Sequence, residues 1–163
     1  MQPGKWPGSA GLPGALVALA LLLGAGCGSN FDAQTNKIYQ PAAGVNNQEG
    51  QVHAFNVLVV HSEGGGTLIG ALLNKAARSD ALVEVTGRAG RSALTADIAG
   101  SQLELPPDQL AQLGDDAAVS ISGEGLNLGA TVEITLRFQN AGPVTLEVPV
   151  VARSGDYATV PVR

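Results

Sequence analysis

Hydrophobic and polar residues alternate along most of the chain after Gln51, in short runs separated by Gly, Pro, Asn and Asp. A period of two is typical of strands that bury one face, because successive side chains of a strand point to opposite sides. The runs lie at 52–61, 67–73, 81–86, 94–98, 103–105, 119–122, 131–138 and 144–150. We therefore predict an all-β fold, an immunoglobulin/cupredoxin-like β-sandwich of about seven to eight antiparallel strands.

The last two runs form the most regular part of this pattern, in the stretch LRFQNAGPVTLEVPV from Leu136 to Val150. Their alternation on both sides of a short turn predicts a hairpin that serves as scaffold. The run at 52–61 is apolar on both faces in its middle, which favours a central strand. Asp108–Leu113 is expected to form one helical turn, and the last residues, 153–163, are expected to be a loose tail or an edge strand.

The N-terminal part has a different pattern, because Leu12–Gly26 is a continuous apolar run that ends in small residues. The run is typical of a secretory signal and too short for a spanning helix, which needs about 20 apolar residues. Leu23–Cys27 resembles the cleavage site of bacterial lipoprotein signals, which implies lipidation of Cys27. The alternative is that Cys27 is a small residue in an ordinary cleaved signal.

These patterns give a domain organisation in four parts. Residues 1–26 are expected to be the signal peptide, and 27–50 the lipidated Cys27 with a flexible tether rich in Gly, Asn and Gln. Residues 51–152 are expected to form the β-sandwich, and 153–163 the tail. The expected location is the outer face of the cell membrane, where two or more acyl chains on Cys27 would anchor the protein.

Charge and chemistry narrow the possible functions. Nine basic against 14 acidic residues give a net charge of −5, which disfavours nucleic acid as a partner. The only histidines, His53 and His61, lie eight positions apart on one predicted strand, so they should share a face yet lie too far apart to hold one metal ion. They are weak metal candidates, with strand-end surface histidines as the plainer interpretation. We find no nucleophile, base or nucleotide motif, so we expect no enzyme and no cofactor.

The stretch from Gln102 to Val150 resembles the C-terminal half of PCuAC-type periplasmic copper chaperone domains. The match is closest at 132–150, where a strand ending in Phe138 is followed by Ala141-Gly142 and a Val-rich strand ending in Pro149-Val150. Leu72–Gly87 fits the N-terminal half more loosely. The resemblance covers residues 51–152. The chain is similar in this respect to actinobacterial lipoproteins that carry the same domain.

The resemblance implies Cu(I) binding through two Met and two His, with one His-x-Met on the strand before a Gly loop. In this chain that strand is 117–123, which holds Ala118, Ser120 and Ser122 at the relevant positions. We therefore expect a membrane-anchored, copper-chaperone-like module that has lost the metal site and binds an unidentified protein partner. The alternative is copper handling through non-standard ligands such as His53 and His61.

Overall fold

The computed structural model describes residues 4, 43–116 and 118–161. Within them lie ten strands: β1 (Val45–Asn47), β2 (Val52–Ser62), β3 (Gly65–Asn74), β4 (Asp80–Ala89), β5 (Ser92–Ile98), β6 (Leu103–Leu105), β7 (Leu110–Leu113), β8 (Val119–Ser122), β9 (Thr131–Phe138) and β10 (Val144–Ala152). One 3-10 helix follows them at Gly155–Tyr157. The alternating pattern therefore produced the strands that it predicts, and the all-β, cupredoxin-like fold class is confirmed.

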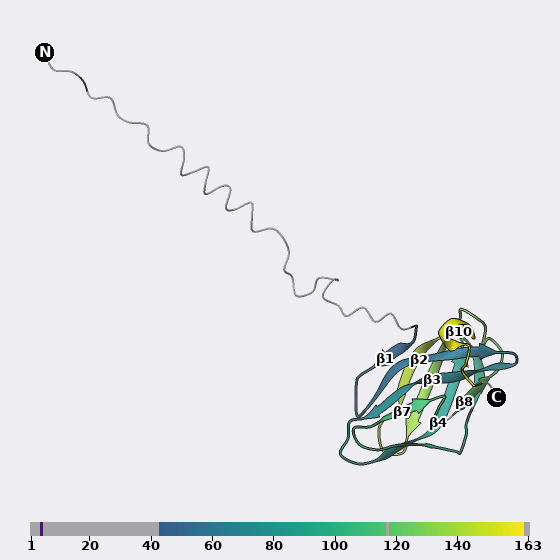
Figure 1. The fold of residues 1–163 in the computed structure, drawn as a ribbon, viewed down its shortest axis with the longest axis horizontal. Helices are drawn as coiled ribbons and strands as arrows, with labels where there is room; N and C mark the ends of the chain where they lie inside the picture. Colours follow the sequence, from purple (N-terminus) through teal and green to yellow (C-terminus); the bar gives the residue numbers. More distant parts are fainter. Residues whose placement is uncertain (1–3, 5–42, 117, 162–163) are drawn as a thin grey trace. The chain divides into compact units, whose positions relative to one another are not determined.

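Seven of the strands close on themselves in the order β2-β10-β9-β4-β5-β8-β3, because β3 also pairs with β2. The pairs are antiparallel except that between β2 and β10, which is parallel. Three short strands extend this sheet: β1 pairs with β2, β6 with β4 and β7 with β3. Each pairs with a part of the longer strand that the seven-strand ring leaves unpaired on that side. Figure 1 shows β2, β3 and β7 in front of β4 and β10. Closure matters because it leaves few strand edges open to pairing with other chains.

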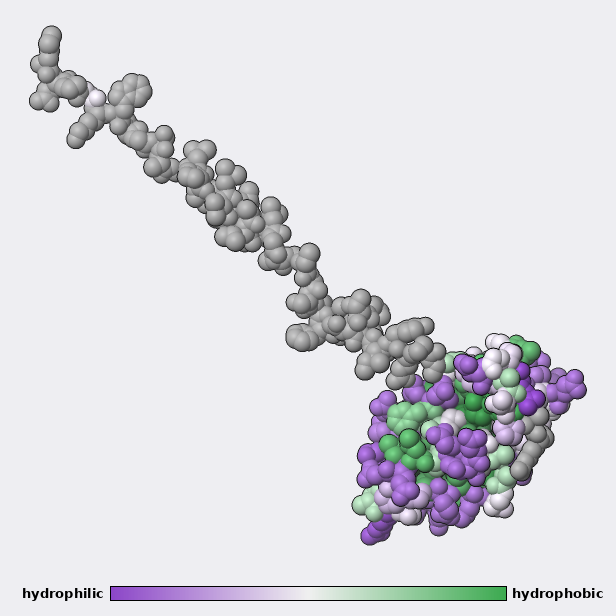
Figure 2. Space-filling model, viewed as in Figure 1, coloured by the Kyte–Doolittle hydropathy of each residue, from purple (hydrophilic) through white to green (hydrophobic). Residues whose placement is uncertain are grey.

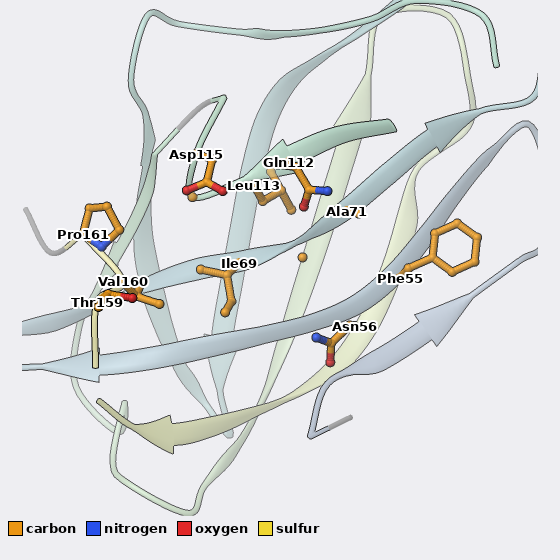
Figure 3. A pocket seen from close by; sticks show the side chains of 12 residues that line it. Phe55, Asn56, Ile69, Ala71, Gln112, Leu113, Asp115, Thr159, Val160 and Pro161 are labelled. Atoms are coloured by element: carbon orange, nitrogen blue, oxygen red, sulfur yellow. The ribbon is translucent and has the colours of Figure 1, made fainter. Parts of the chain in front are cut away.

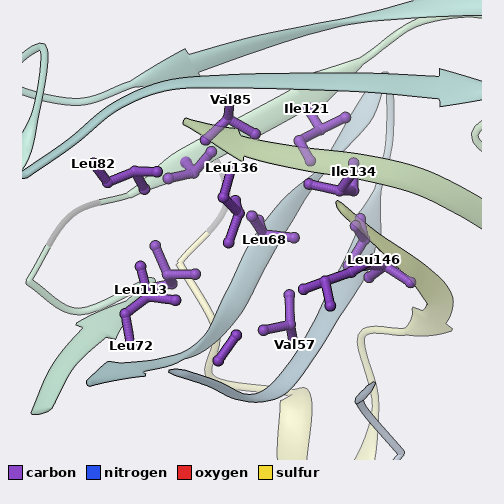
Figure 4. Packing of buried hydrophobic residues seen from close by; sticks show 14 of the residues in the cluster. Val57, Leu68, Leu72, Leu82, Val85, Leu113, Ile121, Ile134, Leu136 and Leu146 are labelled. Atoms are coloured by element: carbon purple, nitrogen blue, oxygen red, sulfur yellow. The ribbon is translucent and has the colours of Figure 1, made fainter. Parts of the chain in front are cut away.

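The core inside the closed sheet consists mainly of aliphatic side chains (Figure 4). Leu68 and Leu72 of β3 and Ile134 and Leu136 of β9 are among these side chains, and all four are fully buried. The middle of β2 is buried on both faces, since Val57, Leu58, Val59 and Val60 have no exposed surface. The central position predicted for this strand is thus confirmed.

Two buried polar side chains fix the chain where strands begin and end. Asn74 is fully buried, and its amide donates to the Arg78 and Leu105 carbonyls at 2.7 and 2.9 Å. The Asp80 carboxylate accepts from the backbone N–H groups of Ala81, Asn140 and Ala141 at 2.8 to 2.9 Å. Asp80 therefore attaches the start of β4 to the turn of the β9–β10 hairpin.

The electrostatics of Asp80 follow from these contacts. Its burial opposes ionisation and raises the pKa, but the hydrogen bonds from Ala81, Ala141 and Asn140 outweigh that effect, so the pKa of Asp80 lies below its usual value. The ionised carboxylate is thus the form that the fold stabilises.

Two elements differ from the sequence-based expectation. The helical turn expected at Asp108–Leu113 is wrong: Leu110–Leu113 is β7, paired with β3. Alternate burial of Ala111 and Leu113 drives this segment onto the sheet. Val45–Asn47, expected in the tether, forms β1 on the edge of β2, so the folded domain begins before Gln51. These two short strands account for ten strands in place of the expected seven to eight.

Candidate functional site

The two histidines lie at opposite ends of β2, and a β-bulge separates them. The pairing of β2 with β3 shifts by one residue between Phe55 and Leu58. An extra residue inverts the alternation of a strand, so His53 and His61 face opposite sides of the sheet. The expectation that they share a face is therefore wrong. His53 packs edge-on against Phe55, with ring centroids 6.2 Å apart.

Neither histidine joins a cluster of other metal ligands. Among residues 4, 43–116 and 118–161, no group of three or more His, Cys, Asp or Glu side chains is placed to hold a metal ion. His53 and His61 are both only partly buried. The structure thus does not bring the two sequence candidates together.

The strand that the resemblance assigns to the His-x-Met pair is β8. Val119 and Ile121 point into the core, whereas Ser120 is partly buried and Ser122 is exposed. Ser120 lies between Thr67 of β3 and Asp97 of β5, and Ser122 lies beside Thr95. This outer surface of β8 is therefore rich in hydroxyl groups.

The C-terminal segment adds no strand among the described residues; it crosses the outer face of the domain. The Thr67 hydroxyl donates to the Pro161 carbonyl at 2.8 Å, and Arg153 Nε donates to the Val160 carbonyl at 3.0 Å. Tyr157 and Val160 pack against the core cluster. The segment is thus a covering for β2 and β3, which explains why Thr67 is only 3% exposed.

Beside this segment lies an open groove of about 370 Å³ on the outer face of the sheet (Figure 3). Its floor is formed by β2 and β3, and its sides by the end of β7 with the turn after it and by the C-terminal segment. The lining residues are Phe55, Asn56, Ile69, Gly70, Ala71, Gln112, Leu113, Gly114, Asp115, Thr159, Val160 and Pro161. Figure 2 views the domain from the side of β2, β3 and β7, with small hydrophobic areas among polar ones.

The floor of the groove is the β-bulge itself. Asn56 has a left-handed backbone with φ of 49°, and Gly70 opposite it has φ of 146°. A Cβ on Gly70 would lie 3.0 Å from the Phe55 carbonyl oxygen and from Val57 Cα, so only glycine fits. Bulges and strained residues of this kind are enriched at functional sites, which makes the groove the best candidate site on the domain.

Strand β1 supports the bulge from the side. The Asn56 side-chain oxygen accepts from the Gly44 N–H at 2.9 Å, and the Asn56 N–H donates to the Asn46 side-chain oxygen at 2.8 Å. Asn side chains tolerate the left-handed conformation and form such local bonds readily. The docking of β1 therefore fixes Asn56 in the position where it lines the groove.

The polar groups of the groove are few. Asn56, Gln112, Thr159 and Asp115 are its polar side chains, and Asp115 is the only charged residue of the twelve. The neighbouring Asp116 serves the fold, since its carboxylate accepts from the Gln112 N–H at 2.7 Å. The groove thus combines apolar walls with two amides, one hydroxyl and one carboxylate, and none of the described residues that line it is a Lys or Arg.

Sequence reasoning did not find this groove, although two signals were present. Asn56 and Gly70 interrupt apolar runs that are otherwise typical of strands. A polar residue and a glycine at facing positions of a hairpin indicate a bulge. The register between the two strands was needed to show that these residues oppose each other.

Comparison with solved structures places the fold among PCuAC domains. The copper-bound PCuAC domain from PmoF2 is 23% identical, with a TM-score of 0.55 over 66% of this chain and 98% of that chain. The apo PCuAC domain from PmoF1 is 21% identical, with a TM-score of 0.56 over 66% and 99%. The apo PmoF2 PCuAC domain gives 23%, 0.54, 68% and 98%. The resemblance seen in the sequence is therefore confirmed as a likeness of fold.

Comparisons at the level of sequence add no further relatives. No family model matches the chain, and no curated protein matches it. The likeness to these solved structures thus concerns the fold, a cupredoxin-like β-fold of the kind that PCuAC domains have.

The expected anchor lies outside the described residues. Cys27 and the apolar run at 12–26 belong to the part of the chain that the structure leaves undescribed. Within residues 4, 43–116 and 118–161, no helix has the length and hydrophobicity to cross a membrane.

Proposed function

We propose that this protein is a lipid-anchored, extracytoplasmic binding module that keeps the fold of PCuAC domains without their Met and His ligands. The observation that carries the proposal is β8, where Ser120 and Ser122 occupy the strand that the resemblance assigns to His-x-Met. Hydroxyl groups are poor ligands for Cu(I), which prefers thiolate and thioether sulfur. The sequence has one methionine, Met1, and one cysteine, Cys27, both before the domain.

A non-catalytic role is supported by the chemistry of the candidate groove. Its side chains offer amides, one exposed carboxylate and apolar surface. Acid–base or nucleophilic catalysis needs a nucleophile or a base held near the reacting group. Asn56 and Gln112 can instead donate and accept hydrogen bonds to a bound partner.

The proposed anchor can be tested separately from the domain. The mature chain is expected to enter the detergent phase of a phase-separation assay, with a mass at Cys27 that includes acyl groups. The variant Cys27→Ala is expected to lose the mass of the acyl groups and to keep the same fold by circular dichroism. An unmodified Cys27 in an aqueous wild-type protein would contradict the anchor.

The alternative function is metal handling through non-standard ligands, and the similarity to a copper-bound PCuAC domain favours it. It would use His53 and His61 for Cu(II) or another harder ion. Because the histidines face opposite sides of the sheet, they would form two independent sites. Unchanged Cu(II) affinity in the double variant His53→Gln/His61→Gln would exclude them.

A further inference from the structure

We infer that the groove over the β-bulge binds an extended peptide segment of a partner protein that carries apolar side chains and a cationic group. The inference rests on the proposed function, because it names the ligand of the proposed binding module. Four features of the groove support it: the path of the C-terminal segment, the apolar floor, the amide side chains and the single charge.

The domain already holds an apolar part of its own chain on this face, the end of the C-terminal segment that follows the 3-10 helix Gly155–Tyr157. Val160 packs against the core cluster, and the Pro161 carbonyl accepts from the Thr67 hydroxyl at 2.8 Å. In Figure 3, Ile69 separates Val160 from Phe55, so the groove continues along the face from the place where this segment lies. Apolar side chains of a ligand would therefore find, next to Val160, the same kind of surface that Val160 itself covers.

The floor offers apolar contact at a spacing that suits a strand. Phe55 pairs with Ala71 across the hairpin, and Leu58 pairs with Ile69 beyond the bulge. Phe55 and Ile69 are only partly buried, so both retain surface that a ligand can cover. A volume of about 370 Å³ is sufficient for a few side chains and too small for a folded element.

The amide groups are suited to peptide bonds. Gln112 is exposed at the rim, and Asn56 is held by β1 through its oxygen, which leaves its amide nitrogen as the donor toward the groove. Each side-chain amide can pair with a backbone N–H or C=O group of a ligand. Apolar walls with a few placed polar groups are the usual composition of such sites.

The charge of the groove selects between cationic and anionic ligands. Among the described residues that line the groove, Asp115 is the only charged one, and it is exposed. The next residue is also an aspartate, and the protein as a whole carries −5. A lysine, arginine or free amine of the ligand would be attracted to this rim, whereas an acidic segment would be repelled.

The test uses the full ¹⁵N-labelled chain in a mild detergent and two synthetic peptides. They are acetyl-Ala-Val-Ala-Lys-Ala-amide and the same peptide with Glu in place of Lys. At low salt the Lys peptide is expected to shift the amide signals of Asn56, Ala71, Gln112 and Asp115. It should bind about fivefold more tightly than the Glu peptide, which is the size of effect that one exposed ion pair supports.

Two variants make the test specific. In Asp115→Asn the preference for the Lys peptide is expected to disappear, while Asp97→Asn, which removes an exposed carboxylate of β5 outside the groove, should keep it. Equal binding of both peptides to the wild type, shifts confined to another face, or no shifts at millimolar peptide would each overturn the inference. None of these results would alter detergent partitioning or copper titration, so the proposed function is judged separately.

Discussion

Two hairpins of this domain contrast in regularity. In β9–β10 the pairing runs from Val144 with Leu136 to Pro149 with Thr131 without a shift. In β2–β3 the pairing slips by one residue at Asn56, where the backbone is left-handed and Gly70 stands opposite. The regular hairpin buries its inward face and presents polar residues outward, and the groove lies on the irregular one. The β9–β10 hairpin therefore serves as scaffold, and the β2–β3 hairpin carries the candidate site.

The contrast has a physical cause. A hairpin whose side chains alternate without interruption gains its stability from the burial of its inward face. A bulge bends the strand, inverts the alternation and opens the surface, at a cost in backbone strain. Such a cost is sustained in β2–β3 because Asn56 forms one hydrogen bond with Asn46 of β1 and one with Gly44 just before it.

The largest expected effect comes from the core of the regular hairpin. Ile134→Ala removes a fully buried side chain and should lower the free energy of unfolding by about 3 kcal/mol. Ile69→Ala, its counterpart in the groove, removes a partly buried side chain and should lower it by about 1 kcal/mol. Urea unfolding of both variants checks this order, and equal losses would contradict it.

The next effect concerns the attachment of β4 to the hairpin turn. Asp80→Asn should destabilise the protein by about 2 kcal/mol at neutral pH, since it removes the charge that three backbone N–H groups surround. The folded pKa of Asp80 lies below the unfolded one, so its contribution is complete above the unfolded pKa and is lost as the pH falls through the folded pKa. Urea unfolding of wild type and variant should therefore converge in acid, and a constant difference would contradict the assignment.

An effect of similar size tests the bulge. Gly70→Ala should cost about 2 kcal/mol, because the new Cβ meets the Phe55 carbonyl and Val57 in a left-handed backbone. Gly142→Ala in the turn of the regular hairpin is the matched control, since a Cβ there meets nothing within 4 Å. Thermal unfolding should show a loss for the first variant alone.

The smallest effect concerns the coupling of β1 to the groove. Asn56→Ala should cost about 1 kcal/mol, because it leaves the Gly44 N–H without its acceptor and places alanine in a left-handed conformation. Hydrogen exchange at residues 44–47 should become faster. Asn56→Gly should recover the backbone part of the loss, and a cost equal to that of alanine would show that strain is not involved.

The sequence was sufficient for the regular part of the fold. Alternation predicted eight of the ten strands, and the hairpin from Leu136 to Val150 followed its pattern residue by residue. β1 was missed because VNN contains a single apolar residue, and β7 because LAQL has apolar residues on both faces, with Leu110 exposed. Each is a strand only because a longer neighbour offers it a free edge.

The candidate site was harder to predict for the same reason. His53 and His61 appeared to share a face because the count of eight assumes an unbroken strand. The extra residue at the bulge places the two histidines on opposite faces. The residues around Asn56 do not show this change until the register between β2 and β3 is known. Ser120 and Ser122, by contrast, were located on β8 as predicted from the sequence.

The measurement that tests the central claim most directly is a competition titration of the protein against a Cu(I) chelator. A PCuAC-type fold without sulfur or paired histidine ligands should leave the chelator fully loaded at equal concentrations of protein and chelator. Removal of one equivalent of Cu(I) by the protein would contradict the claim and show that this chain binds copper through other ligands.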